Sequence, residues 1–82
     1  MSRVLLFGRL RDLAGWRERE IAPSPRTLAE LRAHLAHEDN ALGEALSHPS
    51  VRIAVDQQVV TDEAVPLGEA SEIAFMPPMS GG

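Results

Sequence analysis

Ile73-Ala74-Phe75-Met76, followed at once by Pro77-Pro78, is the stretch that decides the fold. Four apolar residues ended by prolines are typical of a buried strand, because proline cannot donate a hydrogen bond to a strand ladder. At the other end of the chain, Val4-Leu5-Leu6-Phe7 forms a similar run that ends at Gly8. Strands with continuous apolar sequence are covered on both faces, so we predict that these two lie side by side, in parallel, at the centre of a sheet.

The residues between these strands predict an α+β layer. Thr27-Leu28-Ala29-Glu30 matches a helix capping box, and Leu28, Leu31 and Leu35 form an apolar stripe along the helix, with Glu30 and Arg32 expected to face water. We also predict a turn or single helical turn at 11–15, an outer strand over 16–21 and a short helix over 41–46. Residues 51–55 alternate as a half-buried strand should, with every second side chain facing the core, and a further strand follows over 59–60. This order predicts a ubiquitin-like β-grasp: a mixed sheet with one main helix packed on one face.

The chain of 82 residues fits one domain and leaves no room for a second, since a chain of this length already buries only a modest share of its surface. We expect residues 1–76 to form the β-grasp domain and residues 77–82 to form an extended, flexible tail. Met79-Ser80-Gly81-Gly82 has no periodicity that would pack it against the body. At roughly 3.3 Å per residue, the tail reaches up to about 20 Å, which suits insertion into the active site of another protein.

Composition narrows the classes of function. The chain has no cysteine, so disulfides, thiolate metal sites and a cysteine nucleophile are excluded. The net charge of -4 argues against nucleic acid as the main partner, although seven of the eight basic residues, all arginines, lie in residues 1–32. No run is long enough to cross a membrane, and we expect a cytoplasmic protein.

Gly81-Gly82 carries the group through which the chain could react, the terminal carboxylate. A terminal carboxylate is an anion at neutral pH and a poor electrophile, so it must be activated before it can react. Adenylation would convert it into a mixed anhydride that a sulfur nucleophile attacks, and two glycines present the carbonyl without an obstructing side chain. The tail is therefore predicted to be a substrate for other enzymes rather than a catalyst.

Several segments resemble one family: residues 4–7, 11–15, 27–35 and 54–57, and above all Phe75-Met76-Pro77-Pro78-Met79-Ser80-Gly81-Gly82. Together they are similar to the MoaD-like small subunits of molybdopterin synthase, which are ubiquitin-like sulfur carriers. The likeness spans nearly the whole chain. Its most specific part is the diproline before the Ser-Gly-Gly ending, since the related thiamine sulfur carriers share the diglycine but usually lack the diproline and are shorter.

The resemblance implies that Gly82 carries the sulfur. An E1-like adenylating enzyme consumes ATP to activate Gly82, and a sulfur-donor protein supplies the sulfur of the resulting 1-thioglycine. The tail then enters the large, MoaE-like subunit of a synthase heterotetramer, where two sulfur transfers convert cyclic pyranopterin monophosphate into the molybdopterin dithiolene. The resemblance also implies a partner-binding surface of Phe7, Val59 and Met76, with Arg11 beside it, and no cofactor bound directly to this chain.

Other interpretations remain open at this point. A carrier for thiamine synthesis or tRNA thiolation would share the diglycine, and a purely noncovalent ubiquitin-like module would use only the apolar surface. His34 and His37 are spaced to share a metal, but a third ligand is missing, so no metal site is proposed. Glu18 and Glu20 are interpreted as a solvated edge, and Trp16 as a side chain that packs over the first hairpin.

Overall fold

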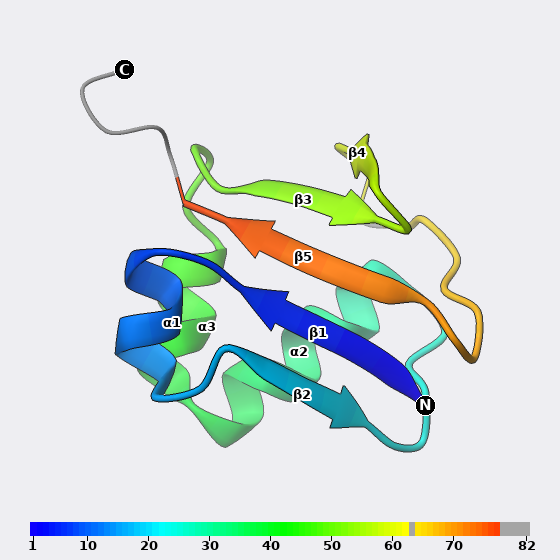
Figure 1. The fold of residues 1–82 in the computed structure, drawn as a ribbon, viewed down its shortest axis with the longest axis horizontal. Helices are drawn as coiled ribbons and strands as arrows, with labels where there is room; N and C mark the ends of the chain where they lie inside the picture. Colours follow the sequence, from blue (N-terminus) through cyan, green and yellow to red (C-terminus); the bar gives the residue numbers. More distant parts are fainter. Residues whose placement is uncertain (63, 78–82) are drawn as a thin grey trace.

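Five strands and three helices follow one another in residues 1–62 and 64–77, the part of the chain that this computed structural model describes (Figure 1). The elements are β1 (Ser2–Leu6), α1 (Arg9–Ala14), β2 (Glu18–Ile21), α2 (Leu28–Glu38), α3 (Asn40–Leu46), β3 (Arg52–Val55), β4 (Gln58–Val60) and β5 (Glu72–Met76). The predicted order of strands is confirmed. The single helical turn expected at residues 11–15 is the longer helix α1, which ends at Gly15 with φ 83°.

The strands form one mixed sheet in the order β2-β1-β5-β3-β4. β1 and β5 pair in parallel, with Val4 opposite Ile73 and Leu6 opposite Phe75, and all other pairs are antiparallel. The two strands with continuous apolar sequence are therefore neighbours at the centre of the sheet, as predicted. This arrangement is that of a β-grasp. It brings the C-terminal ends of β1 and β5 together at one end of the sheet, where the predicted tail begins.

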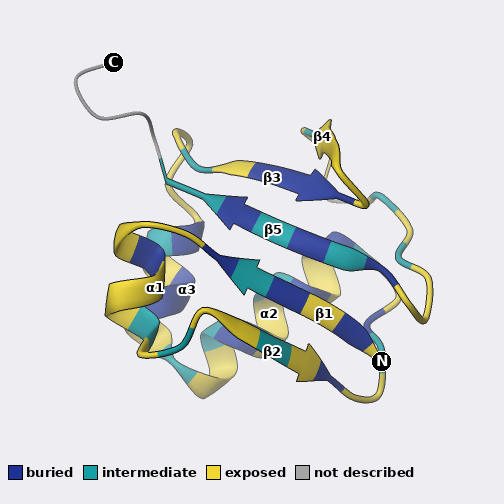
Figure 2. Ribbon diagram, viewed as in Figure 1, coloured by how far each residue is buried: buried dark blue, intermediate teal, exposed yellow. Residues whose placement is uncertain are grey.

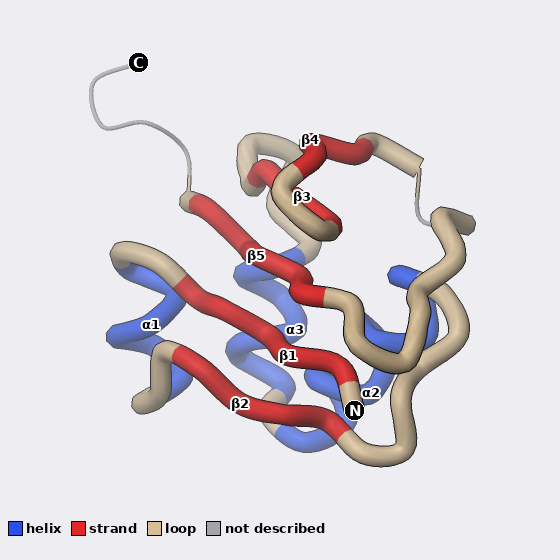
Figure 3. The backbone as a smooth tube through the Cα atoms, turned by 45° about the vertical axis from the view of Figure 1, so that its right-hand side comes forward, coloured by secondary structure: helices blue, strands red, loops and turns tan. Residues whose placement is uncertain are grey.

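The core lies between the sheet and the helices, which cover a single face (Figures 2 and 3). From the strands it receives Val4, Leu6, Ile73 and Phe75, each at most 2% exposed. The predicted stripe of Leu28, Leu31 and Leu35 faces them from α2 and is equally buried, and α3 adds Leu42 and Leu46. Burial of each such side chain contributes roughly 1.5–3 kcal/mol, so this layer is the main source of stability.

Local signals in the sequence start and end the elements as predicted. Thr27 Oγ1 accepts a hydrogen bond from the Glu30 backbone N–H at 3.2 Å, which caps α2. The Glu30 carboxylate in turn accepts from the N–H of Arg26 at 3.4 Å, one residue before the partner expected in a capping box. Asp56 and Gln57 take positive φ angles of 50° and 72°, which close the tight turn between β3 and β4.

Two expectations are corrected. Ala54 was expected on the exposed side of an alternating strand, yet Ile53, Ala54 and Val55 are all buried. Ala54 is small and lies between Ala74 of β5 and Val59 of β4, whose strands cover it. Arg32 was expected to face water, but its Nη2 donates to the carbonyl of Leu46 at 2.8 Å and its side chain is half-buried.

Pro78, Met79, Ser80, Gly81 and Gly82 lie outside the described residues, so the extended tail over residues 77–82 stays a prediction. Within the described part of the chain, no helix combines the length and the apolar character needed to cross a membrane.

Candidate functional site

Pro77, the first residue of the predicted tail, is held in place by contacts with the turn between β1 and α1. The Phe7 N–H donates to the carbonyl of Phe75 at 3.2 Å, which extends the parallel pairing one residue beyond β1. The next residue, Gly8, has φ 57° and ψ -132°, a conformation open to glycine but strained for other residues. The ring of Pro77 packs against this glycine. The starting point of the predicted tail is thus held by the body of the protein.

The face of the sheet opposite the helices carries an apolar patch beside the tail. Leu5 pairs with Ala74, Ala74 with Ala54, and Ala54 with Val59, so these side chains form one row across four strands. Met76 and Phe7 follow toward the tail, with the same strand alternation as Ala74 and Leu5. We call Leu5, Phe7, Val59, Ala74 and Met76 the open-face patch.

Three of the four predicted partner-binding residues, Phe7, Val59 and Met76, belong to this patch. Phe7 is 47% exposed and Val59 is 61% exposed, which is unusual for large apolar side chains. Met76 is half-buried and lies opposite Arg52 of β3. Arg11 stands apart on α1, where its guanidinium pairs with the Asp12 carboxylate at 3.9 Å. The sequence interpretation missed Leu5 and Ala74, which strand alternation would have placed beside Phe7 and Met76.

Charged side chains bound the patch on the side away from the tail. Arg3 of β1 lies between two acids of β2, with Nε 3.4 Å from Glu18 and Nη2 3.9 Å from Glu20. These exposed pairs contribute little to stability, but they leave the edge strand charged and discourage edge-to-edge pairing. The predicted solvated edge at Glu18 and Glu20 is confirmed.

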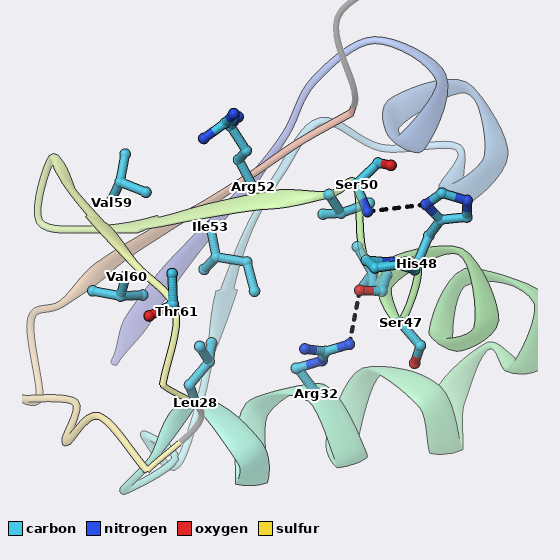
Figure 4. A pocket seen from close by; sticks show the side chains of 13 residues that line it. Leu28, Arg32, Ser47, His48, Ser50, Arg52, Ile53, Val59, Val60 and Thr61 are labelled. Atoms are coloured by element: carbon cyan, nitrogen blue, oxygen red, sulfur yellow. Dashed lines mark hydrogen bonds between the residues drawn. The ribbon is translucent and has the colours of Figure 1, made fainter.

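A pocket of about 520 Å³ lies on the helical side of β3 (Figure 4). Ile53, Leu28 and Arg32 face it, whereas Arg52 and Val59 extend from the other side of the strand (Figure 4). Some of its polar groups bond within the protein: Arg32 donates to the Leu46 carbonyl at 2.8 Å, and His48 Nδ1 accepts from the Ser50 N–H at 3.0 Å. The pocket nevertheless presents polar as well as apolar side chains, and Arg52 and Thr61 are among the polar ones.

His34, one of the two residues weighed as metal ligands, has another partner. His34 Nε2 lies 3.4 Å from Glu38, and Arg19 donates to both oxygens of the same carboxylate at 2.8 and 3.4 Å. The Arg19 guanidinium also lies 5.1 Å from the ring of Trp16, which packs partly against the core. In the described part of the chain, no three His, Cys, Asp or Glu side chains are grouped as a metal site requires.

Comparison with known proteins connects this geometry to one family. The ThiS family model matches residues 4–82. The molybdopterin synthase sulfur carrier subunit of Escherichia coli (strain K12) is 35% identical over 82 residues, which is all of both chains. The match in sequence therefore includes both the body and the predicted tail.

Solved structures share the fold. The small archaeal modifier protein 1 of Methanosarcina acetivorans superposes with a TM-score of 0.85 at 23% identity, over 99% of this chain and 95% of its own. This likeness supports the ubiquitin-like fold alone. A chain from the complex of subunits 1 and 2 of the molybdopterin-converting factor of Helicobacter pylori superposes with a TM-score of 0.71 at 25% identity, over 99% of this chain and 97% of its own.

Proposed function

This chain belongs to the ThiS family, and from that premise we propose that it is a sulfur carrier and the small subunit of a molybdopterin synthase. The observation that carries the proposal is that the family match runs through Gly82, the residue whose carboxylate would bear the sulfur. The full-length relative in E. coli is named for the same role.

The chemistry proposed for Gly82 takes place in the active sites of other enzymes. A carboxylate oxygen attacks the α-phosphorus of ATP and pyrophosphate leaves, which gives an acyl adenylate. A sulfur nucleophile then attacks the glycyl carbonyl carbon and AMP leaves, so that one oxygen of the carboxylate is finally replaced by sulfur as a 1-thioglycine. The protein contributes the reach of its tail and a body that docks, and the enzymes contribute the catalytic side chains.

The proposed partners follow from this cycle. An E1-like adenylating enzyme activates the tail, a sulfur-donor protein supplies the sulfur, and a MoaE-like large subunit receives the loaded tail within a heterotetramer. The H. pylori neighbour comes from a complex of subunits 1 and 2 of the molybdopterin-converting factor, which supports a partner of this kind. We propose the open-face patch as the docking surface, with Arg11 of α1 as a further polar contact, because exposed apolar side chains beside the predicted tail favour burial against another protein.

Loading of the tail is tested by intact mass. Incubation with the activating enzyme, ATP and a sulfur source should add about 16 Da, the difference between sulfur and oxygen. A variant that lacks Gly82 should show no such shift. Loaded protein mixed with the large subunit and cyclic pyranopterin monophosphate should then form the dithiolene. An unchanged mass of the full-length protein would contradict the proposal.

A second function is favoured by the exposure of Phe7 and Val59, since a noncovalent ubiquitin-like module would bind through this patch alone. Deletion of Gly82 separates the two: a module keeps all activity, whereas a carrier keeps binding and loses sulfur transfer. A carrier for thiamine synthesis or tRNA thiolation is distinguished by which substrate the loaded protein converts.

A further inference from the structure

A groove of about 600 Å³ lies on the helical side of the tail's base, between α1, α3 and Pro77. Apolar side chains make up most of its lining: Leu10, Leu13, Ala45, Val51 and Pro77. Leu10 belongs to the buried core, but Leu13 is 48% exposed, although it is a large apolar residue on a helix that has a core-facing side. We call this surface the α1–α3 groove.

The α1–α3 groove and the open-face patch meet at the tail. Pro77 lines the groove and also packs against Gly8, the residue that follows Phe7 of the patch. Apolar surfaces therefore flank the base of the tail on both sides of the sheet. A protein that takes the tail into a channel surrounds its base, so that protein meets both surfaces at once.

The charges around the tail's base indicate the chemistry of the partner. Arg9 and Asp12 both line the groove, and the Asp12 carboxylate pairs with Arg11 at 3.9 Å. Arg17 and Arg52 lie at the same end of the sheet, and neither they nor Arg9 form an ion pair within residues 1–62 and 64–77. The opposite end of the sheet is acidic and holds Asp56, Glu69 and Glu72. A partner that approaches along the tail is therefore attracted if it carries carboxylates around its channel.

We propose that the α1–α3 groove is a second docking site, into which the MoaE-like large subunit inserts an apolar side chain flanked by a carboxylate. This inference rests on the proposed function, because it takes the large subunit as the protein that receives the tail. The apolar side chain lies against Leu13 and Pro77, and the carboxylate faces Arg9. The large subunit then holds the base of the tail from both sides.

Two substitutions test the site through the affinity for the purified large subunit, measured by calorimetry. Leu13→Gln keeps a helix-forming residue of similar size but removes the apolar surface, and Arg9→Glu reverses the charge; each should weaken binding about tenfold or more. Ala29→Gln, at an exposed position in the first turn of α2, is the matched control and should bind within about twofold of the unchanged protein. Circular dichroism and urea midpoints verify that the variants fold.

A photo-crosslinking amino acid at position 13 identifies the occupant. A cross-link to the large subunit supports the proposal, and one formed only with a second copy of this chain, or only with the activating enzyme, overturns it. Affinities of Leu13→Gln and Arg9→Glu within about twofold of the control would also overturn it. The mass shift on loading does not depend on the groove, so a failure to load sulfur counts against the proposed function and leaves the docking result to be judged by itself.

Discussion

The ring of Pro77 packs so closely against Gly8 that a Cβ atom on this glycine would lie 2.7 Å from Pro77 Cγ. Gly8 also has a φ of 57° combined with ψ -132°, which a residue with a side chain adopts only under strain. Two independent features therefore require glycine at this position. Because Gly8 follows β1 and Pro77 follows β5, their contact ties the base of the tail to the centre of the sheet.

Replacement of Gly8 by alanine should destabilise the protein by about 1–3 kcal/mol, since it adds both backbone strain and a clash with Pro77. Gly15→Ala is the matched control: Gly15 has φ 83°, but nothing lies within 4 Å of the Cβ that would be added. Gly15→Ala should destabilise the protein only through backbone strain, by about 1 kcal/mol. Urea unfolding of both variants measures the difference, and equal losses would show that the contact with Pro77 has no energetic weight.

Phe7→Ala should weaken the complex with the large subunit about tenfold or more, because aromatic side chains near the centre of an interface carry much of its binding free energy. The folded protein should lose less than about 1 kcal/mol of stability, since the ring is 47% exposed. Glu69→Ala, at an exposed position beyond the other end of the sheet, is the control. Calorimetry measures both affinities. An unchanged affinity of Phe7→Ala would exclude the open-face patch as the docking surface.

Features that depend on near neighbours in the sequence were predictable. The cap at Thr27, the end of α1 at Gly15 and the turn at Asp56 follow from local backbone and side-chain chemistry. The parallel pair of β1 and β5 was predicted from their continuous apolar runs, but the expectation that both faces of these strands are covered was wrong, because the helices cover one face and leave Phe7 47% exposed on the other. Phe7 and Met76, which the resemblance implied as partner-binding residues, lie on the face opposite the core, as alternation along residues 4–7 and 73–76 requires.

The remaining features depend on how distant elements pack. Arg32 was expected in water because its helix position faces outward, but the end of α3 brings the Leu46 carbonyl within 2.8 Å of its guanidinium. The α1–α3 groove arises from the packing of two short helices against Pro77, and neither helix alone indicates it. Such contacts follow from interhelical angles and distances, which the periodicity of one segment does not contain.

The carboxylate of Glu38 gives a prediction about pH. Its pKa is lowered from the ordinary value of 4.5, first by the hydrogen bonds from Arg19 and further by the charges of Arg19, His34 and His37. A pKa that is lower in the folded than in the unfolded state stabilises the protein above pH 4.5, and this contribution is lost as the pH falls through the folded value. Glu38→Gln should therefore reduce stability at neutral pH and have no effect in strong acid.

Urea midpoints at about pH 7 and about pH 3 measure this pH dependence. Glu44→Gln serves as the control, because Glu44 is exposed and its carboxylate forms no ion pair within the described part of the chain. The urea midpoint should depend less on pH in Glu38→Gln than in this control. If the urea midpoints of both variants changed equally between the two pH values, the pairing of Glu38 with Arg19 would not contribute to stability.

Gly43→Ala tests the closest approach of two helices. Gly43 is buried in α3, and a Cβ there would lie 2.4 Å from Ala36 Cβ and 2.7 Å from Ala36 Cα on α2. Alanine has the higher intrinsic helix propensity, by about 1 kcal/mol, so local preference alone predicts that the substitution stabilises the protein. The clash with the α2 backbone acts in the opposite direction, and we expect a net loss of about 1–3 kcal/mol.

The matched control for this prediction is Gly68→Ala. The Cβ added at Gly68 would meet only Ser71 Oγ at 3.6 Å, an ordinary contact, and the φ of Gly68 is not in the left-handed region. We therefore expect a neutral effect or a gain of about 0.4–1 kcal/mol through the unfolded state. Thermal and urea unfolding compare the two variants. A Gly43→Ala protein as stable as Gly68→Ala would mean that α2 and α3 lie farther apart in solution, because the backbone of Ala36 cannot move aside as a flexible side chain can.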